Sequence, residues 1–135
     1  MGSAVVDTSV LIATLDASDA LHTHALRALE TARRDHDLII PALAYAELMV
    51  GVASAGPQRE RFVDEKISEL GRIEPLTQPI AREGARLRAR HGMTLADALI
   101  LATGIVLRAD GILTADRRWR RVDRRVVVVG PRGTR

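Results

Sequence analysis

The chain has 135 residues, of which 47% are hydrophobic and 2% aromatic, so it can form one domain with an aliphatic core. It contains no cysteine, which excludes disulfides, a thiolate nucleophile and cysteine-ligated zinc, and a cytoplasmic location is expected. No uncharged run reaches the roughly 18 residues of a membrane span, so no membrane association is expected. The net charge is +3, and every basic residue except Lys66 is arginine. Arginine suits bidentate contact with phosphate, so either a polyanionic partner or a solvated arginine-rich surface is consistent with this composition.

Residues 4–15, AVVDTSVLIATL, predict a short buried strand that leads directly into a helix. Thr8 or Ser9 is expected to be the N-cap of that helix. Asp7 lies at the junction and is the only charged residue between Met1 and Leu15. A carboxylate at the carboxyl end of a buried strand stands where open α/β sheets bind their ligands.

The chain then alternates helices with short apolar strands. Apolar residues at helical spacing predict a helix over residues 19–34, and residues 38–40 predict a strand that Pro41 ends. Residues 42–53, ALAYAELMVGVA, predict a helix that is apolar nearly all round and therefore buried.

A more polar helix is predicted over residues 58–70. Phe62, Ile67 and Leu70 are expected on its inward side, and Gly71 is a suitable C′ residue.

The next helix, over residues 78–90, follows a strand predicted at 73–76 and is capped by Thr77. One face carries apolar or small residues at helical spacing and ends in a histidine: Ile80, Gly84, Leu87 and His91. A different face carries a stack of three arginines: Arg82, Arg86 and Arg90. Like charges at this spacing repel, so an anionic partner along this face would be favourable.

The last third of the chain contains the most apolar helix, over residues 94–107, which is expected to be central. Strands are predicted at 112–114 and 126–129, joined by a short connection over 115–121. Strands that alternate with helices imply an α/β fold, in which a mostly parallel sheet lies between helix layers. We expect a single domain over residues 1–130 and a flexible tail over 131–135.

Four acidic residues stand out because each follows a strand or lies in an otherwise uncharged run: Asp7, Glu47, Asp97 and Asp116. A buried carboxylate is costly unless it is paired or bound to a metal. Four carboxylates close together would raise one another's pKa, and a divalent cation removes that conflict. Mg²⁺ is the usual cation when the substrate brings phosphate.

Each acid also has a purely structural interpretation. Asp7 can cap the first helix, and Thr94 with Asp97 forms a capping box. Glu47 can be the exposed side of its helix, and Asp116 can be a turn residue. The coincidence of four such acids favours a common site.

Hydroxyls and arginines flank the proposed acids. Thr8, Ser9 and Thr114 are candidates to hold a carboxylate or a metal-bound water from the second shell. The stretch RRWRRVDRR begins beside Asp116, and four of its arginines are candidates for contact with a phosphodiester backbone: Arg117, Arg118, Arg120 and Arg121. Trp119 within it either stacks on a base or, as we favour, anchors the loop to the core.

The ordered set of acids, Asp7 in DTS, Glu47, Asp97 in TLADALILATG and Asp116 in LTADRRW, resembles that of PIN-domain ribonucleases. The length resembles the VapC toxins of type II toxin–antitoxin systems. The resemblance implies a three-layer α/β/α fold with a five-stranded sheet. It also implies a Mg²⁺- or Mn²⁺-dependent endoribonuclease that forms a homodimer, or a larger toxin–antitoxin assembly, and is inhibited by a cognate antitoxin.

On this interpretation the four acids surround one or two Mg²⁺ ions, with Asp7 and Asp97 as direct ligands, and the arginines hold the RNA backbone. Two alternatives are a catalytically silent binding module and a receiver-like signalling domain with an acidic pocket. A receiver domain would need a second acid after the first strand and a lysine after the last, whereas Thr8-Ser9 and Gly130-Pro131 occupy those places.

Overall fold

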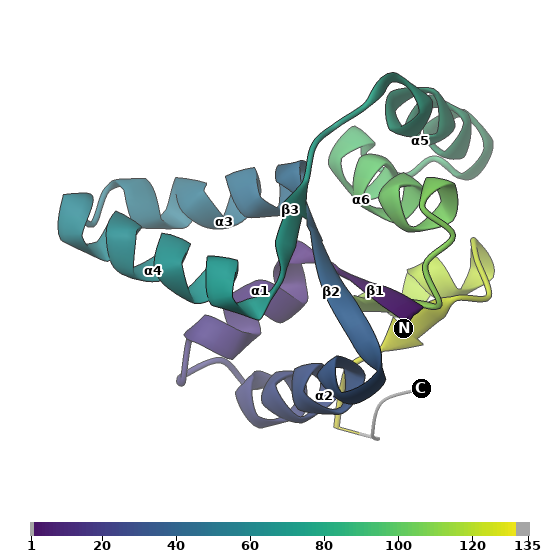
Figure 1. The fold of residues 1–135 in the computed structure, drawn as a ribbon. Coiled ribbons are helices and arrows are strands. Elements are labelled where there is room, and N and C mark those ends of the chain that lie inside the picture. The colour runs from purple at the N-terminus through teal and green to yellow at the C-terminus, as the bar shows by residue number, and fades with distance from the viewer. Residues whose placement is uncertain (1, 132–135) are drawn as a thin grey trace.

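The computed structural model describes residues 2–131, and over these residues it has one sheet of five parallel strands. The strands are β1 (Gly2–Val6), β2 (His36–Pro41), β3 (Arg72–Glu74), β4 (Gly111–Thr114) and β5 (Val126–Val128). Their order across the sheet is β3-β2-β1-β4-β5 (Figure 1). The central strand β1 therefore has β2 on one side and β4 on the other.

Six helices connect the strands. They are α1 (Thr8–Leu15), α2 (His22–Asp35), α3 (Ala42–Ala53), α4 (Pro57–Leu70), α5 (Gln78–His91) and α6 (Leu95–Val106), followed by a short 3₁₀ helix, η1 (Arg117–Arg121). Helices α1 and α2 lie against one face of the sheet and α6, backed by α5, lies against the other, while α3 and α4 extend away beside β3 (Figure 1). This is the predicted three-layer α/β/α architecture.

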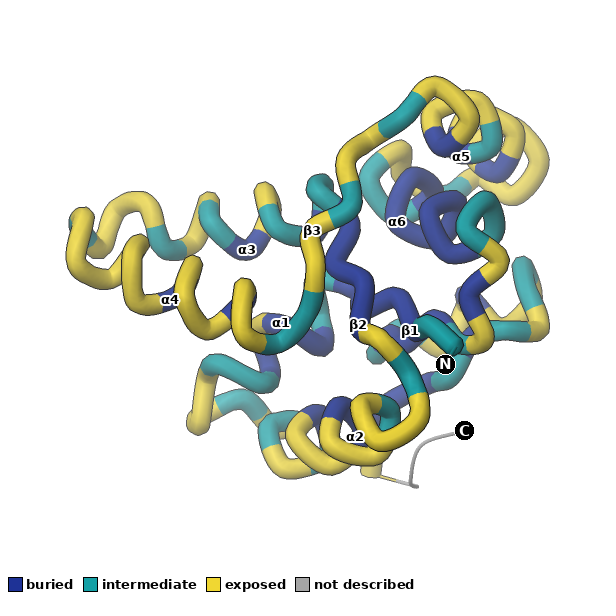
Figure 2. Tube along the Cα trace, viewed as in Figure 1, coloured by how far each residue is buried: buried dark blue, intermediate teal, exposed yellow. Residues whose placement is uncertain are grey.

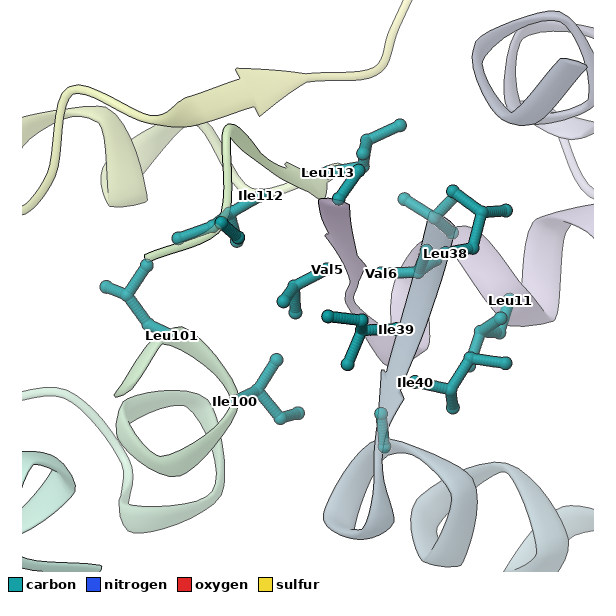
Figure 3. Packing of buried hydrophobic residues seen from close by; sticks show 14 of the residues in the cluster. Val5, Val6, Leu11, Leu38, Ile39, Ile40, Ile100, Leu101, Ile112 and Leu113 are labelled. Atoms are coloured by element: carbon teal, nitrogen blue, oxygen red, sulfur yellow. The ribbon is translucent and has the colours of Figure 1, made fainter. Parts of the chain in front are cut away.

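The core forms because alternate strand residues point to opposite faces of the sheet. Figure 3 shows Val5 and Ile112 turned toward α6, whose Ile100 contributes from the helix side. Val6 and Ile40 point the other way, toward α1. Figure 2 shows the result: β1, β2 and the inner side of α6 are buried, whereas the outer sides of α4 and α5 are exposed.

Two glycines let helices approach closely on the α6 side. A Cβ built on Gly104 would lie 2.5 Å from Cδ1 of Ile112, so α6 packs almost directly on β4. A Cβ on Gly84 would lie 2.5 Å from Cδ2 of Leu99, so α5 packs equally closely on α6. Both contacts keep α6, and the residues at its amino end, in a fixed position over the sheet.

The structure corrects the cap of the first helix. The N-cap is Asp7 and not Thr8 or Ser9, because the Asp7 side chain accepts a hydrogen bond from the backbone N–H of Thr8 at 2.8 Å. Thr77 and Thr94 are the N-caps of α5 and α6, as predicted.

The inward side of α4 was predicted incorrectly in part. Ile67 is buried, but Phe62 is 47% exposed and Val63 takes its place in the core. The ring of Phe62 instead lies beneath the charged ends of Arg59 and Lys66, at 5.3 and 5.5 Å from its centroid. These cations cover part of the ring on the surface.

Gly71 and His91 also differ from expectation. Gly71 follows α4 in an extended conformation, and its small size matters because a Cβ there would lie 2.4 Å from the carbonyl oxygen of Leu38. His91 is exposed, unlike the three residues before it on its predicted face. The strand predicted at 73–76 is β3, which ends before Pro75 because proline cannot donate to the ladder.

No helix among residues 2–131 is long and apolar enough to span a membrane. The described residues share one sheet, and the single domain over 1–130 stays a prediction. Apart from Pro131, the predicted tail over 131–135 lies outside the described residues.

Candidate active site

The candidate site lies at the carboxyl ends of β1 and β4. From β1 the chain proceeds to β2 on one side of the sheet, and it later returns to add β4 on the other side. Open parallel sheets bind ligands outside the strand ends at such a switch point. Asp7 follows β1 here, and its backbone N–H donates to the carbonyl oxygen of Leu113 on β4 at 2.9 Å.

Asp7 is the buried acid of the site, with 5% of its surface exposed. Its Oδ2 accepts hydrogen bonds from Ser9 Oγ at 2.8 Å and from Thr114 Oγ1 at 2.7 Å. Burial raises the pKa of Asp7 above its usual range, the hydroxyl hydrogen bonds oppose this, and the negative charge of Asp97 adds to the increase. The hydrogen bonds thus hold the carboxylate in one orientation, and its burial disfavours the ionised form.

The other acids are brought in by three different segments. Glu47, on α3, accepts a hydrogen bond from Thr8 Oγ1 at 2.7 Å. Asp97 lies in the first turn of α6, where its backbone N–H donates to Thr94 Oγ1 at 3.2 Å. Asp116 follows β4 and caps η1. The role proposed for Asp7 as a helix cap is therefore real. Asp97 follows the cap Thr94 in the first turn of α6, and Asp116, expected to be a turn residue, caps η1. These structural roles coexist with positions in the site.

All four predicted acids line one hollow of about 430 Å³. Its remaining walls are Thr8, Ser9, Ile12, Ala115 and Trp119. The hollow is not uniformly buried, contrary to the expectation from the uncharged runs: Glu47 is exposed, and Asp97 and Asp116 are half-buried. Helix α3 is only partly covered, with Val50 76% exposed, which is why its acid reaches solvent.

The acids influence one another's charge. The pKa of Asp97 is raised, first by burial and then by the negative charges of Asp116 and Glu47, while the hydroxyl of Thr94 opposes this increase. The pKa of Asp116 is lowered, chiefly by its hydrogen bonds with Arg118. The hollow thus concentrates negative charge. Among residues 2–131, Asp116 is the one of the four acids that forms an ion pair, with Arg118.

The side chains that line the hollow are of the kind that binds a divalent metal. The donors are carboxylate oxygens with hydroxyls behind them, which is the chemistry that Mg²⁺ and Mn²⁺ prefer. Within residues 2–131, however, no group of three or more Asp, Glu or His side chains is placed to hold one ion. The chemical type of these donors therefore suits Mg²⁺ or Mn²⁺. The carboxylates line the same hollow, but their oxygens do not converge on one point in it.

Arg118 explains part of that arrangement, and the sequence prediction missed its role. Its Nε and Nη2 donate to Oδ1 and Oδ2 of Asp116 at 3.0 and 2.7 Å. The two-residue spacing of Asp116 and Arg118 was visible in the sequence, but Arg118 was assigned only to RNA binding.

The remaining arginines divide between two places. Arg118 and Arg121 line a second hollow, of about 370 Å³, which shares Asp97, Asp116 and Trp119 with the first. Arg117 and Arg120 are exposed on η1, and Arg82, Arg86 and Arg90 are exposed along α5. Trp119 is 2% exposed and anchors η1 to the core, so the interpretation as a base-stacking residue is wrong.

Comparison with known families agrees with this geometry. A sequence model of the PIN domain matches residues 4–125, which include all four acids. The chain belongs to the PIN domain family. This PIN domain has no significant match among curated protein sequences.

Solved structures with a similar fold include a toxin–antitoxin complex and an RNA-cleaving toxin. A toxin–antitoxin complex from Klebsiella pneumoniae is 28% identical, with 93% of this chain and 97% of that chain covered and a TM-score of 0.78. FitAcB from Neisseria gonorrhoeae is 26% identical, with 84% and 87% covered and a TM-score of 0.62. VapC20 from Mycobacterium tuberculosis, described as a sarcin–ricin loop cleaving toxin, is 19% identical, with 89% and 95% covered and a TM-score of 0.70.

Proposed function

We propose that this PIN domain is a metal-dependent endoribonuclease that acts as the toxin of a toxin–antitoxin pair. The observation that carries the proposal is that four acids from four separate segments line one hollow at the switch point of the sheet. Membership of the PIN family and the structural likeness to toxin–antitoxin complexes support the same assignment.

In this proposal Asp7 and Asp97 bind Mg²⁺ or Mn²⁺ directly, and Glu47 and Asp116 bind directly or through water. A bound divalent cation acidifies water and neutralises the charge that develops on the leaving oxygen of a phosphodiester. The charges on Asp97, Glu47 and Asp116 repel one another, and a cation among them would relieve that repulsion.

Three hydroxyls position the proposed ligands. Ser9 and Thr114 both donate to Oδ2 of Asp7. Within the described part of the chain, Oδ1 has only the backbone N–H of Thr8 as a partner. Thr8 likewise orients Glu47. Such outer hydrogen bonds fix the direction of a ligand's lone pairs, and their loss commonly weakens metal binding about 10- to 100-fold.

The arginines supply the contacts with the RNA backbone. Arg118 and Arg121 adjoin the acids through the second hollow, and Arg82, Arg86 and Arg90 extend a cationic face along α5. Guanidinium groups bind phosphate in a bidentate manner, which suits this role.

The partners in this proposal are RNA, a cognate antitoxin that covers the acidic hollow, and a second copy of the chain in a homodimer. A neighbouring gene for a small DNA-binding protein, whose product co-purifies with this chain, would identify the antitoxin.

The proposal is tested by incubating the purified chain with a panel of tRNA, rRNA and mRNA in Mg²⁺, in Mn²⁺ and in chelator. We expect cleavage in either metal and none in chelator. The Asp97→Asn variant should lose at least about 100-fold in rate, since it removes a ligand charge but retains the backbone cap. Asp37→Asn is the matched control, because Asp37 is exposed at the opposite, amino end of the sheet.

Equal rates for the Asp97→Asn variant and the wild type would remove Asp97 from the mechanism. A catalytically silent binding module is the second candidate, favoured by the lack of a ready three-acid cluster within residues 2–131. The two are separated by thermal unfolding with and without Mn²⁺. A metal enzyme gains stability by about 2.7 kcal/mol at 100 times the dissociation constant, whereas a silent module gains none.

A further inference from the structure

The contact between Asp116 and Arg118 occupies both oxygens of one proposed ligand. Asp116 Oδ1 accepts from the backbone N–H of Arg118 at 2.9 Å and from its Nε at 3.0 Å, and Oδ2 accepts from Nη2 at 2.7 Å. A carboxylate so engaged has few lone pairs left for a metal.

The pair lies at the boundary between the two hollows. Asp116 lines both of them, whereas Arg118 lines only the second, beside Arg121 and His91. The backbone N–H of Asp116 donates to Thr114 Oγ1 at 3.1 Å, and Thr114 in turn donates to Asp7. The backbone of Asp116 is therefore tied to the buried acid, and its side chain, which lines both hollows, is held by Arg118.

We propose that Arg118 is a positioning residue that holds Asp116 away from the metal until a phosphate of the RNA takes over the guanidinium. The inference rests on the proposed function and adds a coupling between RNA binding and assembly of the metal site. When phosphate replaces Asp116 on Arg118, the freed carboxylate turns toward Asp7 and Asp97 and completes the set of acids.

The exchange is physically cheap in both directions. The Arg118 side chain is 79% exposed and that of Asp116 is 24% exposed, so phosphate can reach the guanidinium from solvent. Exposed ion pairs contribute little to stability, and the planar fork of arginine can donate paired hydrogen bonds to a phosphate as well as to a carboxylate. Such coupling is reciprocal, so the metal must favour RNA binding as much as RNA favours metal binding.

The first experiment measures Mn²⁺ binding by titration calorimetry without RNA, so it does not depend on catalysis. Arg118→Gln should tighten Mn²⁺ binding about fivefold, the upper range for release of an exposed ion pair. In the Asp116→Asn background the same substitution should change binding less than about twofold, because no carboxylate remains to be released. Arg118→Lys retains the charge without the fork and should fall between the wild type and Arg118→Gln.

The second experiment measures the affinity for a fluorescent single-stranded RNA in chelator. Asp116→Asn should strengthen RNA binding, because it frees Arg118 for phosphate. This gain should be largely lost in the Arg118→Gln background. Arg61→Gln, an exposed site on α4, is the charge-matched control in both experiments, and thermal unfolding checks that each variant is folded.

Two results would overturn the inference. One of them leaves the proposed function intact, and the other rejects it as well. If Arg118→Gln tightens Mn²⁺ binding equally in both backgrounds, only its charge matters; the coupling is then rejected while the proposed nuclease stands. If the wild type binds no Mn²⁺ at all, the inference and the proposed function fail together.

Discussion

Asp7 shows at the scale of one residue how the candidate site holds an unfavourable charge. Its raised pKa means that the folded protein binds its proton more tightly than the unfolded chain does. The group therefore contributes full stability below the unfolded pKa near 3.8, and this contribution is lost as pH rises through the higher folded value. At neutral pH without metal, ionised Asp7 destabilises the fold.

Replacing Asp7 by asparagine should therefore stabilise the protein. In chelator at pH 7 we expect Asp7→Asn to raise the free energy of unfolding, because the neutral amide avoids the cost of burying the ionised carboxylate. The hydroxyls of Ser9 and Thr114 can rotate to accept from the new amide, since each has two lone pairs. Urea unfolding at several pH values measures the effect, and the advantage should shrink as pH falls toward 4.

Adding Mn²⁺ to the same samples provides the control. The wild type should gain stability from the metal and the Asp7→Asn variant should gain little, which would reverse their order. A variant that is less stable than the wild type in chelator would show that the carboxylate contributes more through its hydrogen bonds than its burial costs.

The acids were recognisable from the sequence because each stands alone among apolar residues or directly follows a strand. Their exposure was not recognisable in the same way. Glu47 is exposed although its helix has no other charge, because only part of α3 faces the core. The pairing of Asp116 with Arg118 was missed because either neighbouring arginine, Arg117 or Arg118, could have formed it.

At the scale of elements, α6 is the helix on which the site depends most. It is buried along most of its length and carries Asp97 in its first turn, and Gly104 lets it pack on β4. Its position was expected to be central from its apolar composition. The short distance between α6 and β4 was not expected, because the sequence does not distinguish a glycine at a helix–strand contact from a glycine that faces solvent.

Two glycine variants distinguish these situations. Gly104→Ala should lower the free energy of unfolding by about 1–3 kcal/mol, because the new methyl group overlaps the buried side chain of Ile112. Gly51→Ala, on the exposed side of α3 with no atom within 4 Å of the added Cβ, should raise it by about 0.5–1 kcal/mol. Chemical denaturation measures both, and a change of the same sign in the two variants would contradict the packing described for α6.

Most elements were predicted to within a few residues, and the helix over Ala42–Ala53 without error. Caps at Thr77 and Thr94 were also correct, because a cap is a contact between residues three apart. The inward side of α4 was less predictable. Phe62 and Val63 are adjacent, and the choice between them depends on how the helix is rotated against α3, which is not a local property.

At the scale of the whole molecule, the distribution of arginine allows the proposed RNA binding to be tested. Helices α2 and α5 lie over opposite faces of the sheet, and both carry exposed arginines (Figure 1). Only those on α5 belong to the face that adjoins the acids through α6. Two hypotheses therefore make different predictions: either RNA responds to the net charge of the protein, or it contacts the arginines of α5 specifically.

Replacing Arg82, Arg86 and Arg90 together by glutamine should weaken RNA binding and reduce its dependence on salt. If each contacts one phosphate, the slope of log affinity against log salt should fall in magnitude by about 2, at roughly 0.7 per phosphate on single-stranded RNA. Fluorescence anisotropy in chelator at several salt concentrations measures the slope.

The matched control replaces Arg27, Arg33 and Arg34 on α2, which lowers the formal net charge from +3 to 0 exactly as the first set does. It should leave the slope nearly unchanged. An equal loss of slope in both triple variants would mean that RNA responds to the overall charge and that α5 is not a specific contact surface.

The sequence by itself determined the types of element, their order, the caps Thr77 and Thr94 and the identity of the four candidate acids. These depend on periodicity, capping and isolated charge, which are relations among near neighbours along the chain. Only the tertiary structure decided that the acids line one hollow, that Glu47 reaches solvent and that Asp116 is turned toward Arg118. Those features arise from the strand order and from the packing of helices on the sheet, in which residues more than 100 positions apart, such as Asp7 and Thr114, come into contact.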